Sequence, residues 1–166
     1  MRTVFVTVGT TQFESLVDVL LSDEILGLLA KHGYKRLVMQ LGRGPEPTVP
    51  ASLPLKVEWY RFKPSLDEDM QGAELIVSHA GAGSILEGMR LGKLMIVVVN
   101  DALMHNHQQE LAEELESRRH LLSTTPGGLA ATLRELAERP PELAPLPAAD
   151  PTLFPAFLST ALGVAP

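Results

Sequence analysis

The sequence predicts an α/β fold, a Rossmann-like, doubly wound parallel sheet covered by helices. Short β-branched runs, bounded by glycine, proline or asparagine, alternate with helical patterns, which is typical of strand–helix crossover units. The chain has 166 residues, of which 45% are hydrophobic, so it can bury one core and is short for two domains. Two loops of small residues follow predicted strands, where such folds bind ligands.

The strands are expected at residues 4–8, 36–41, 55–60, 75–78, 94–99 and 121–123. Apolar residues at helical spacing predict the first helix over residues 13–31, with an interruption at Ser22 and Asp23 and a stop near Gly33. Later helices are expected at 64–71, 84–91, 106–118 and 127–138. Most helices therefore follow a strand, as in a parallel sheet.

Two proline-rich segments divide the chain. Residues 42–54 hold four prolines and two glycines, and residues 140–155 hold six prolines, so both are expected to be loops or extended tethers. We expect a globular domain over residues 1–139, a proline-rich tether over 140–151 and an apolar C-terminal docking helix over 152–166.

Composition excludes several classes of protein. The net charge is −6 and the basic residues are scattered, so nucleic acid is not expected as a partner. The chain has no cysteine, which excludes disulfides and thiolate metal sites and fits the cytosol. Its apolar runs are far shorter than the roughly 20 residues of a membrane span, so membrane contact is expected only through a partner or a surface segment.

The segment Ser78-His79-Ala80-Gly81-Ala82-Gly83-Ser84 lies between a predicted buried strand and a helix. Gly9, Thr10 and Thr11 follow the first strand in the same way. Helix N-termini at this edge offer N–H groups and a positive dipole end to a phosphate, and two such loops suit a diphosphate. The alternative is that the glycines only serve tight turns. Neither loop contains a dinucleotide fingerprint, a P-loop or a nucleophile elbow.

Several polar residues near these loops allow two interpretations. Glu87 can accept hydrogen bonds from a ribose, but Ser84 and Glu87 also have the spacing of a capping box, which spacing alone slightly favours. Asn106 and Gln109 can contact sugar hydroxyls or cap a helix. His79 can donate to phosphate or be structural. A metal site is not expected, because no acidic or thiol ligand accompanies the histidines at fixed spacing.

Four blocks of the sequence together resemble a known family. They are residues 6–11, residues 60–63, residues 78–84 with Glu87, and residues 106–108. In this order they resemble the catalytic subunit of the eukaryotic UDP-GlcNAc transferase of the dolichol-linked oligosaccharide pathway, from Met1 to about Leu122. That family is similar to the donor-binding, C-terminal domain of GT-B glycosyltransferases, including the bacterial enzyme that adds GlcNAc to the peptidoglycan precursor.

The resemblance implies a role for each matching residue. Gly9, Thr10 and Thr11 would face the diphosphate, the backbone near Arg61 and Phe62 would read uracil, and Glu87 would take the ribose hydroxyls in preference to the capping box. Phosphate would be held by His79, Ala80, Gly81, Ala82, Gly83 and Ser84. The sugar would be contacted by Asn106, Gln108 and Gln109.

The resemblance also implies the reaction and the partners. The reaction is inverting transfer of GlcNAc from UDP-GlcNAc to GlcNAc-diphosphodolichol, without metal or cofactor, on the cytosolic face of the endoplasmic reticulum. A GT-B site lies between two Rossmann-like domains, and this chain has room for one, so a membrane-anchored acceptor-domain subunit is expected to complete a heterodimer and can supply the base. Two alternatives stay open: a small transferase active alone, and a nucleotide-binding module that transfers nothing.

Overall fold

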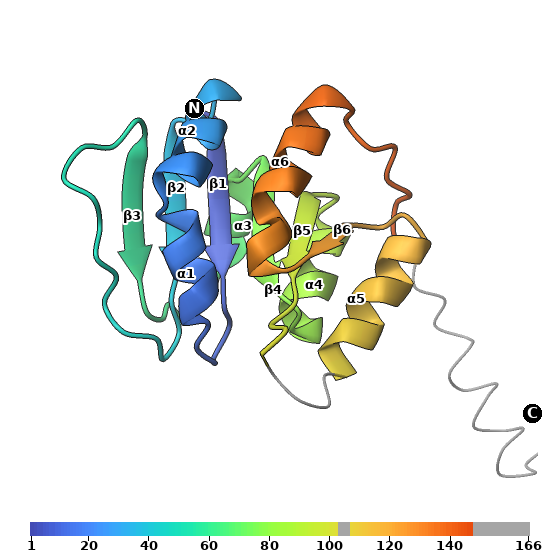
Figure 1. Ribbon diagram of the computed structural model, residues 1–166. Coiled ribbons are helices and arrows are strands. Elements are labelled where there is room, and N and C mark those ends of the chain that lie inside the picture. The colour runs from blue at the N-terminus through green and yellow to red at the C-terminus, as the bar shows by residue number, and fades with distance from the viewer. Residues whose placement is uncertain (103–106, 148–166) are drawn as a thin grey trace, which may run out of the picture.

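The computed structural model describes residues 1–102 and 107–147, in which six parallel strands form one sheet (Figure 1). The strands are β1 (Thr3–Thr7), β2 (Arg36–Gln40), β3 (Lys56–Tyr60), β4 (Leu75–His79), β5 (Leu94–Val98) and β6 (Leu122–Thr124). Their order in the sheet is β3-β2-β1-β4-β5-β6, and every neighbouring pair is parallel. This is the Rossmann strand order, so the predicted fold class is confirmed.

The first predicted helix is two helices. α1 (Glu14–Leu20) ends before α2 (Asp23–Lys31) begins, at the predicted interruption. Ser22 stands before α2 in an extended conformation, and its hydroxyl accepts a hydrogen bond from the Ile25 amide at 3.4 Å. An N-cap residue has this conformation and this hydrogen bond, so Ser22 starts a new helix instead of continuing the first.

The later helices are α3 (Asp67–Gly72), α4 (Ala82–Arg90), α5 (His107–Ser117) and α6 (Leu129–Glu138). α3 starts three residues later than predicted, because the Ser65 hydroxyl accepts the Asp67 amide at 3.0 Å and forms a turn there. α4 starts two residues earlier than predicted, because Gly81 is extended and serves as its N-cap. A 3-10 turn (Pro126–Gly128) precedes α6.

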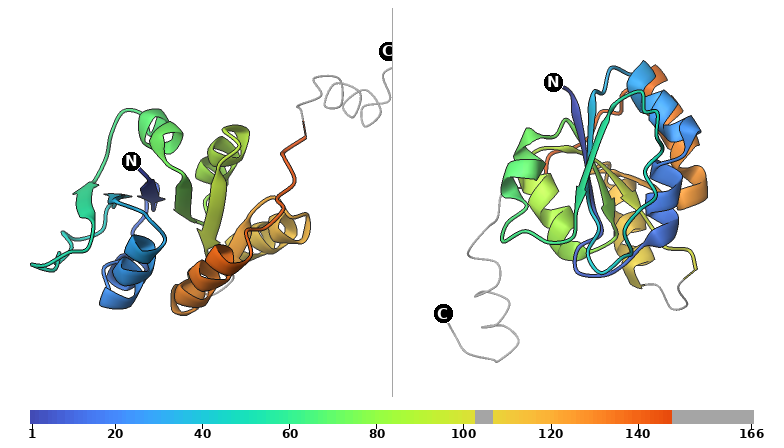
Figure 2. Two further views of the ribbon diagram at one scale, coloured as in Figure 1. Left: turned by 90° about the horizontal axis from the view of Figure 1, so that it is seen from above. Right: turned by 90° about the vertical axis from the view of Figure 1, so that its left-hand side faces the viewer.

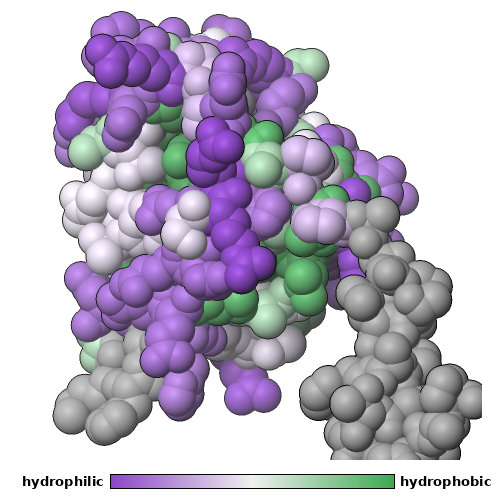
Figure 3. Space-filling model, turned by 90° about the vertical axis from the view of Figure 1, so that its right-hand side faces the viewer, coloured by the Kyte–Doolittle hydropathy of each residue, from purple (hydrophilic) through white to green (hydrophobic). Residues whose placement is uncertain are grey.

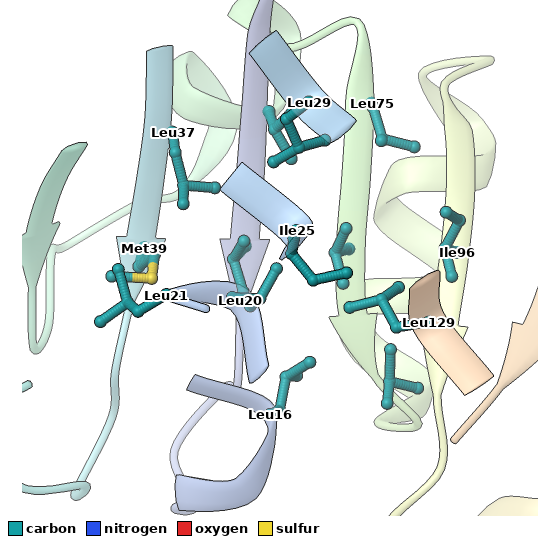
Figure 4. Packing of buried hydrophobic residues seen from close by; sticks show 14 of the residues in the cluster. Leu16, Leu20, Leu21, Ile25, Leu29, Leu37, Met39, Leu75, Ile96 and Leu129 are labelled. Atoms are coloured by element: carbon teal, nitrogen blue, oxygen red, sulfur yellow. The ribbon is translucent and has the colours of Figure 1, made fainter. Parts of the chain in front are cut away.

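Helices cover both faces of the sheet, with α1, α2 and α6 on one face and α3 and α4 on the other (Figures 1 and 2). Successive residues of β1 point to opposite faces: Val4 and Val6 pack in the cluster under α1, α2 and α6, whereas Phe5 packs in the cluster under α3, α4 and α5. In Figure 4, Leu16 and Leu20 of α1 and Ile25 and Leu29 of α2 point toward the sheet. Both faces being buried explains the continuous apolar runs of the strands.

α4 packs closely on β5 because it contains Gly88. A Cβ atom at Gly88 would lie 2.5 Å from Sδ and 2.8 Å from Cε of Met95, closer than atoms in contact approach. A dinucleotide fingerprint assigns this close packing to its third glycine. Leu86 stands at that third position here and is 42% exposed, so Gly88 takes over the packing two residues later.

The described part of the proline-rich segment, residues 140–147, runs without a helix or strand beside α5 and β6. The Ala144 amide donates to the Arg119 carbonyl at 2.7 Å, and the Ala144 carbonyl accepts His120 Nδ1 at 2.9 Å. Leu146 packs against the core cluster under α3, α4 and α5. Figure 3 shows this side of the molecule, where a hydrophobic strip lies among hydrophilic side chains. The expected docking helix falls outside the described residues.

Candidate functional site

The carboxyl ends of β1 and β4 lie side by side in the middle of the sheet. β1 pairs with β2 on one side and with β4 on the other. The strands β2 and β3 therefore extend the sheet from one side of β1, and β4, β5 and β6 extend it from the other side. The switch point of this order lies between β1 and β4, where the loops on the two sides leave a crevice for ligands. The two glycine loops predicted to bind phosphate follow these two strands.

The imidazole of His79 fills the space between the two loops. A Cβ atom at Gly9 would lie 2.7 Å from Cε1 of His79, and one at Gly81 would lie 2.6 Å from the same atom. Both distances are far below the roughly 3.5 Å of a normal carbon contact. Gly9 also has a φ of +65°, which favours glycine. Both positions therefore require glycine while the ring stays in place.

The environment of His79 favours the neutral imidazole. Nδ1 lies 3.3 Å from the Thr7 carbonyl oxygen, which can only accept, so Nδ1 carries the proton in this contact. Burial lowers the pKa of His79, while the bond to Thr7 acts in the opposite direction. The Nε2 atom faces Gly81. In the neutral ring Nε2 is an acceptor, so donation from Nε2 to a phosphate requires a second proton or the other tautomer.

A small cavity of about 120 Å³ opens at this edge of the sheet. The loop after β1, the ends of β4 and β5, and α5 line it, with Thr11, Gln12, Phe13, His79, Val98, Asn100 and Gln108. Three of the residues predicted to bind the donor, Thr11, His79 and Gln108, thus face one space. Gln12 and Asn100 also line it but were not predicted, although both are polar residues that follow strands, which is the signal that pointed to Thr11.

Larger hollows exist elsewhere. One of about 250 Å³ lies just beyond the carboxyl end of β2, between α1 and residues 44–48, away from the two glycine loops, and two others lie at the opposite end of the strands. Those of about 380 and 300 Å³ are both lined by Leu94, the first residue of β5, and by Leu136 and Pro140. Ligands of open parallel sheets bind beyond the carboxyl ends instead.

The buried Gln40 side chain fixes the loop after β1 by hydrogen bonds from inside the protein. Its Oε1 accepts the Thr7 hydroxyl at 2.6 Å and the Gly9 amide at 3.0 Å, while its Nε2 donates to the Gly9 carbonyl at 2.8 Å and to the Arg61 carbonyl at 2.7 Å. The Gly9 N–H therefore points into the protein. Gly9 shapes this loop, and Thr10 and Thr11 are left to present groups outward.

The capping box that the spacing of Ser84 and Glu87 offered as an alternative is absent. α4 begins at Ala82 and has no side-chain cap, so Ser84 stands inside the first turn. The Glu87 carboxyl instead contacts Asp67 at the start of α3. Their hydrogen bond raises the pKa of Glu87 and lowers the pKa of Asp67. Glu87 therefore lies on the α3 side of α4, one turn beyond the glycines.

Side-chain contacts that the sequence did not predict hold the segment after β3 in place. The Tyr60 hydroxyl donates to Asp69 at 2.5 Å, and Lys63 donates to the same carboxylate at 2.6 Å while standing over the Tyr60 ring. Burial raises the pKa of Tyr60 above its usual range, and Asp69 adds to the effect. The Arg61 guanidinium donates to the Gly44 carbonyl. Phe62 is 56% exposed.

The remaining described residues predicted to bind the donor differ in exposure, and none of them lines the cavity. Ala82 and Gly83 are exposed in the first turn of α4, while Ala80 is buried in the core. The Gln109 amide donates to Glu113 at 2.7 Å along α5, so it does not line the cavity. Asn106 lies outside the described residues.

Residues 1–102 and 107–147 contain neither a cluster of metal-ligating side chains nor a helix that could cross a membrane. Among these residues, no three histidine, cysteine or acidic side chains gather where they could hold a metal ion. None of their helices combines the length and the apolar character that crossing a bilayer requires.

The strand order and the two loops at its switch point define the class: a Rossmann-like α/β domain with its ligand crevice between β1 and β4. Residues 3–154 match the glycosyltransferase family 28 C-terminal domain. The chain is 48% identical over 128 residues to human "UDP-N-acetylglucosamine transferase subunit ALG13", covering 75% of this chain and 11% of the human protein. It is 33% identical over 181 residues to the Saccharomyces cerevisiae subunit of the same name, covering 88% of this chain and 89% of that protein.

Solved structures of related proteins have the same fold as this chain. The solution structure of ALG13 superposes with a TM-score of 0.68 at 30% identity, covering 96% of this chain and 94% of that one. Acinetobacter baumannii MurG superposes with a TM-score of 0.59 at 16% identity over 81% of this chain and 39% of its own, which shows the fold alone. The chain belongs to the glycosyltransferase family 28 C-terminal domain family, and within it to the ALG13-type UDP-N-acetylglucosamine transferase subunits. It spans about a tenth of the human and mouse relatives.

Proposed function

We propose that this chain binds UDP-GlcNAc and forms the donor half of an inverting transferase that moves GlcNAc to GlcNAc-diphosphodolichol. The observation that carries the proposal is the cavity at the switch point, where Thr11, His79 and Gln108 converge from three parts of the sequence. The names of the relatives, which are UDP-GlcNAc transferase subunits, support the choice of donor.

The diphosphate would lie between the Thr10–Thr11 loop and the first turn of α4. α4 starts with Ala82 and Gly83, both exposed, and a Cβ atom at Gly83 would meet nothing within 4 Å. A phosphate can therefore approach the free N–H groups of this helix start, where the helix dipole also favours an anion. His79 would donate to a phosphate oxygen through Nε2 after taking up a proton.

Uracil would be read by the backbone after β3. The Arg61 carbonyl already accepts Gln40 Nε2 at 2.7 Å and the Gly42 amide at 3.2 Å, so the base would meet the other backbone groups of Arg61 and Phe62. Glu87 would accept the ribose hydroxyls after breaking its contact with Asp67. Gln108 would contact the sugar, together with Asn106 and, after leaving Glu113, Gln109.

A second, membrane-anchored chain would supply the acceptor domain. The relatives are named subunits, and this chain corresponds to 39% of the MurG chain that it resembles, which supports a half-site. We assign residues 140–151 as a tether and 152–166 as the segment that docks on the partner, at the cytosolic face of the endoplasmic reticulum. Deletion of residues 152–166 is expected to abolish co-purification with that partner, and unchanged co-purification would contradict the assignment.

The proposal is tested by calorimetric titration with UDP-GlcNAc, followed by a transfer assay with a short-chain GlcNAc-diphospholipid. We expect the chain alone to bind UDP-GlcNAc without added metal and to transfer GlcNAc only when co-expressed with its membrane partner. Transfer by the purified chain alone would instead indicate a complete small enzyme. Binding without transfer under every partner tested would indicate a nucleotide-binding module, and no binding would refute the donor site.

A further inference from the structure

Gln40 is a buried amide in an otherwise apolar strand. It ends β2, whose other buried residues are Leu37, Val38 and Met39, and it is 2% exposed. An amide side chain has two acceptor sites on its oxygen and two N–H donors, and all four are used here at distances of 2.6 to 3.0 Å. The orientation is also fixed, because exchanging N and O would set the oxygen against two carbonyl groups.

These four bonds join two loops that lie on opposite sides of β2. On one side are Thr7 and Gly9, at the end of β1 and in the loop that follows it. On the other side is the Arg61 carbonyl, directly after β3. The backbone adds a second link on each side: Gly42 donates to Arg61 at 3.2 Å and Arg43 donates to the Thr11 carbonyl at 2.9 Å. One Gln40 side chain thus spans both loops from within the sheet.

We propose that Gln40 is a positioning residue that couples the uracil-reading backbone at Arg61 to the diphosphate loop at residues 9–11. The proposal rests on the proposed function, because it assigns those two loops to two parts of the same UDP. Gln40 does not touch the ligand itself. When uracil draws the backbone at residue 61 into place, Nε2 transmits the shift to the Gly9 carbonyl and Oε1 transmits it to the Gly9 amide.

Packing alone does not explain a glutamine at this position. Methionine has a similar length and fills such a space without polar atoms. It would leave the proton of the buried Thr7 hydroxyl and the Gly9 carbonyl without this partner, and unpartnered buried polar groups are strongly disfavoured. The Gly9 amide would keep its bond to the Thr7 hydroxyl at 3.1 Å, and the Arg61 carbonyl would keep the Gly42 amide at 3.2 Å. The protein therefore keeps an amide here for its hydrogen bonds and for the loop geometry that they set.

The test compares Gln40→Met with two matched threonine variants in β1. Thr7→Val removes one donor to Gln40 at 2.6 Å and also the acceptor of the Gly9 amide at 3.1 Å. Thr3→Val removes a buried hydroxyl at the other end of the strand, whose bond goes to the Met1 carbonyl at 3.1 Å. We expect Gln40→Met to weaken UDP binding at least tenfold and Thr7→Val several-fold, by calorimetry, with Thr3→Val within twofold of wild type. If Gln40→Met does not fold, Gln40→Glu is compared instead, because a carboxylate can keep accepting from Thr7 and Gly9 but cannot donate to the Gly9 and Arg61 carbonyls; equal UDP binding by the folded variant would overturn the coupling.

Amide NMR provides a readout that a purely structural role would not change. Uridine, which has no phosphate, should shift the amide signals of both residue 61 and residue 9 in the wild type, but only that of residue 61 in Gln40→Met. A wild type that binds UDP, with the folded Gln40→Met binding equally well or with residue 9 still responding to uridine, would overturn the coupling. A wild type that does not bind UDP would overturn the proposed function, and this inference with it.

Discussion

Adding one methyl group at Gly81 should disturb the site through His79. Gly81 has φ −87° and ψ 123°, which any residue adopts, so alanine at this position is not strained by the backbone. A Cβ atom would lie 2.6 Å from Cε1 of His79, and closer still to Nε2. The ring would have to move by about 1 Å to restore a normal contact. It cannot move toward Gly9, whose Cα side is already in close contact with the same ring.

The expected magnitude is the difference between two opposing effects. Overpacking a well-filled site destabilises a protein by about 1–3 kcal/mol, whereas replacing glycine by alanine stabilises by about 0.4–1 kcal/mol through the unfolded state. We therefore expect Gly81→Ala to lower the free energy of unfolding by about 1–2 kcal/mol in urea titrations. Gly83→Ala is the matched control, two residues along the same helix start, because its Cβ would meet nothing within 4 Å.

Combining Gly81→Ala with His79→Ala identifies the cause. If the clash with the ring is responsible, Gly81→Ala should cost nothing in the His79→Ala background, because coupled neighbours are not additive. Gly81→Ala is also titrated with UDP, where it should bind more weakly than wild type; Gly83→Ala is a control for stability alone, because Gly83 faces the proposed phosphate. Equal stability of Gly81→Ala and Gly83→Ala, or a loss for Gly81→Ala that persists without the ring, would refute the placement of His79 between the loops.

The other predictions concern pH and two side chains. Because burial lowers the pKa of His79, the unfolded chain takes up a proton at a higher pH than the folded protein. The free energy of unfolding should therefore fall as pH falls from about 6.5 toward the lowered pKa, and less in His79→Gln. UDP binding should take up a proton, seen as calorimetric heats that vary with the buffer; heats independent of the buffer would count against donation by Nε2. Glu87→Ala should weaken UDP-GlcNAc binding by about 1.5–3 kcal/mol, as expected for a lost bond to a charged group; unchanged affinity would remove Glu87 from the ribose site. Gln108→Ala should weaken UDP-GlcNAc binding more than UDP binding, with Gln109→Ala as the control, and equal effects of the two variants would contradict the sugar contact.

The sequence was sufficient for the fold because both faces of the sheet are buried. Each strand then reads as an apolar run and each helix as a periodic one, and the break at Ser22 carries the signature of a cap. Helix starts were less well predicted. Local hydrogen bonds decide them: the Ser65 hydroxyl delays α3, and the extended Gly81 advances α4. Such bonds depend on backbone angles that the residue types alone do not fix.

The site was predictable where it depends on which strand a residue follows. Thr11, His79 and Gln108 each stand just after a predicted strand or at the helix beyond it, and parallel strands bring such positions to one edge. Gln40 was missed because it stands within a strand, where one polar residue gives no sign of its partners. The capping box was the alternative that spacing alone favoured, because that spacing is shared by any helix with Ser and Glu three apart, and only the true helix start at Ala82 excludes it.

The chemistry at the cavity supports the proposal that a second chain supplies the base. Transfer to a hydroxyl acceptor requires a group that removes its proton. Among the described residues that line the cavity, His79 has the only titratable side chain, and its Nδ1 is directed to Thr7 while its Nε2 faces Gly81. The carboxyl of Glu87 lies against Asp67 instead. The described polar groups therefore suit holding a nucleotide diphosphate, and a base delivered from across the cleft would complete the reaction. The direct test is to add the partner subunit to this chain and assay transfer. The partner should restore transfer to a chain that otherwise only binds the donor, and mutation of the partner's cleft residues should abolish transfer again.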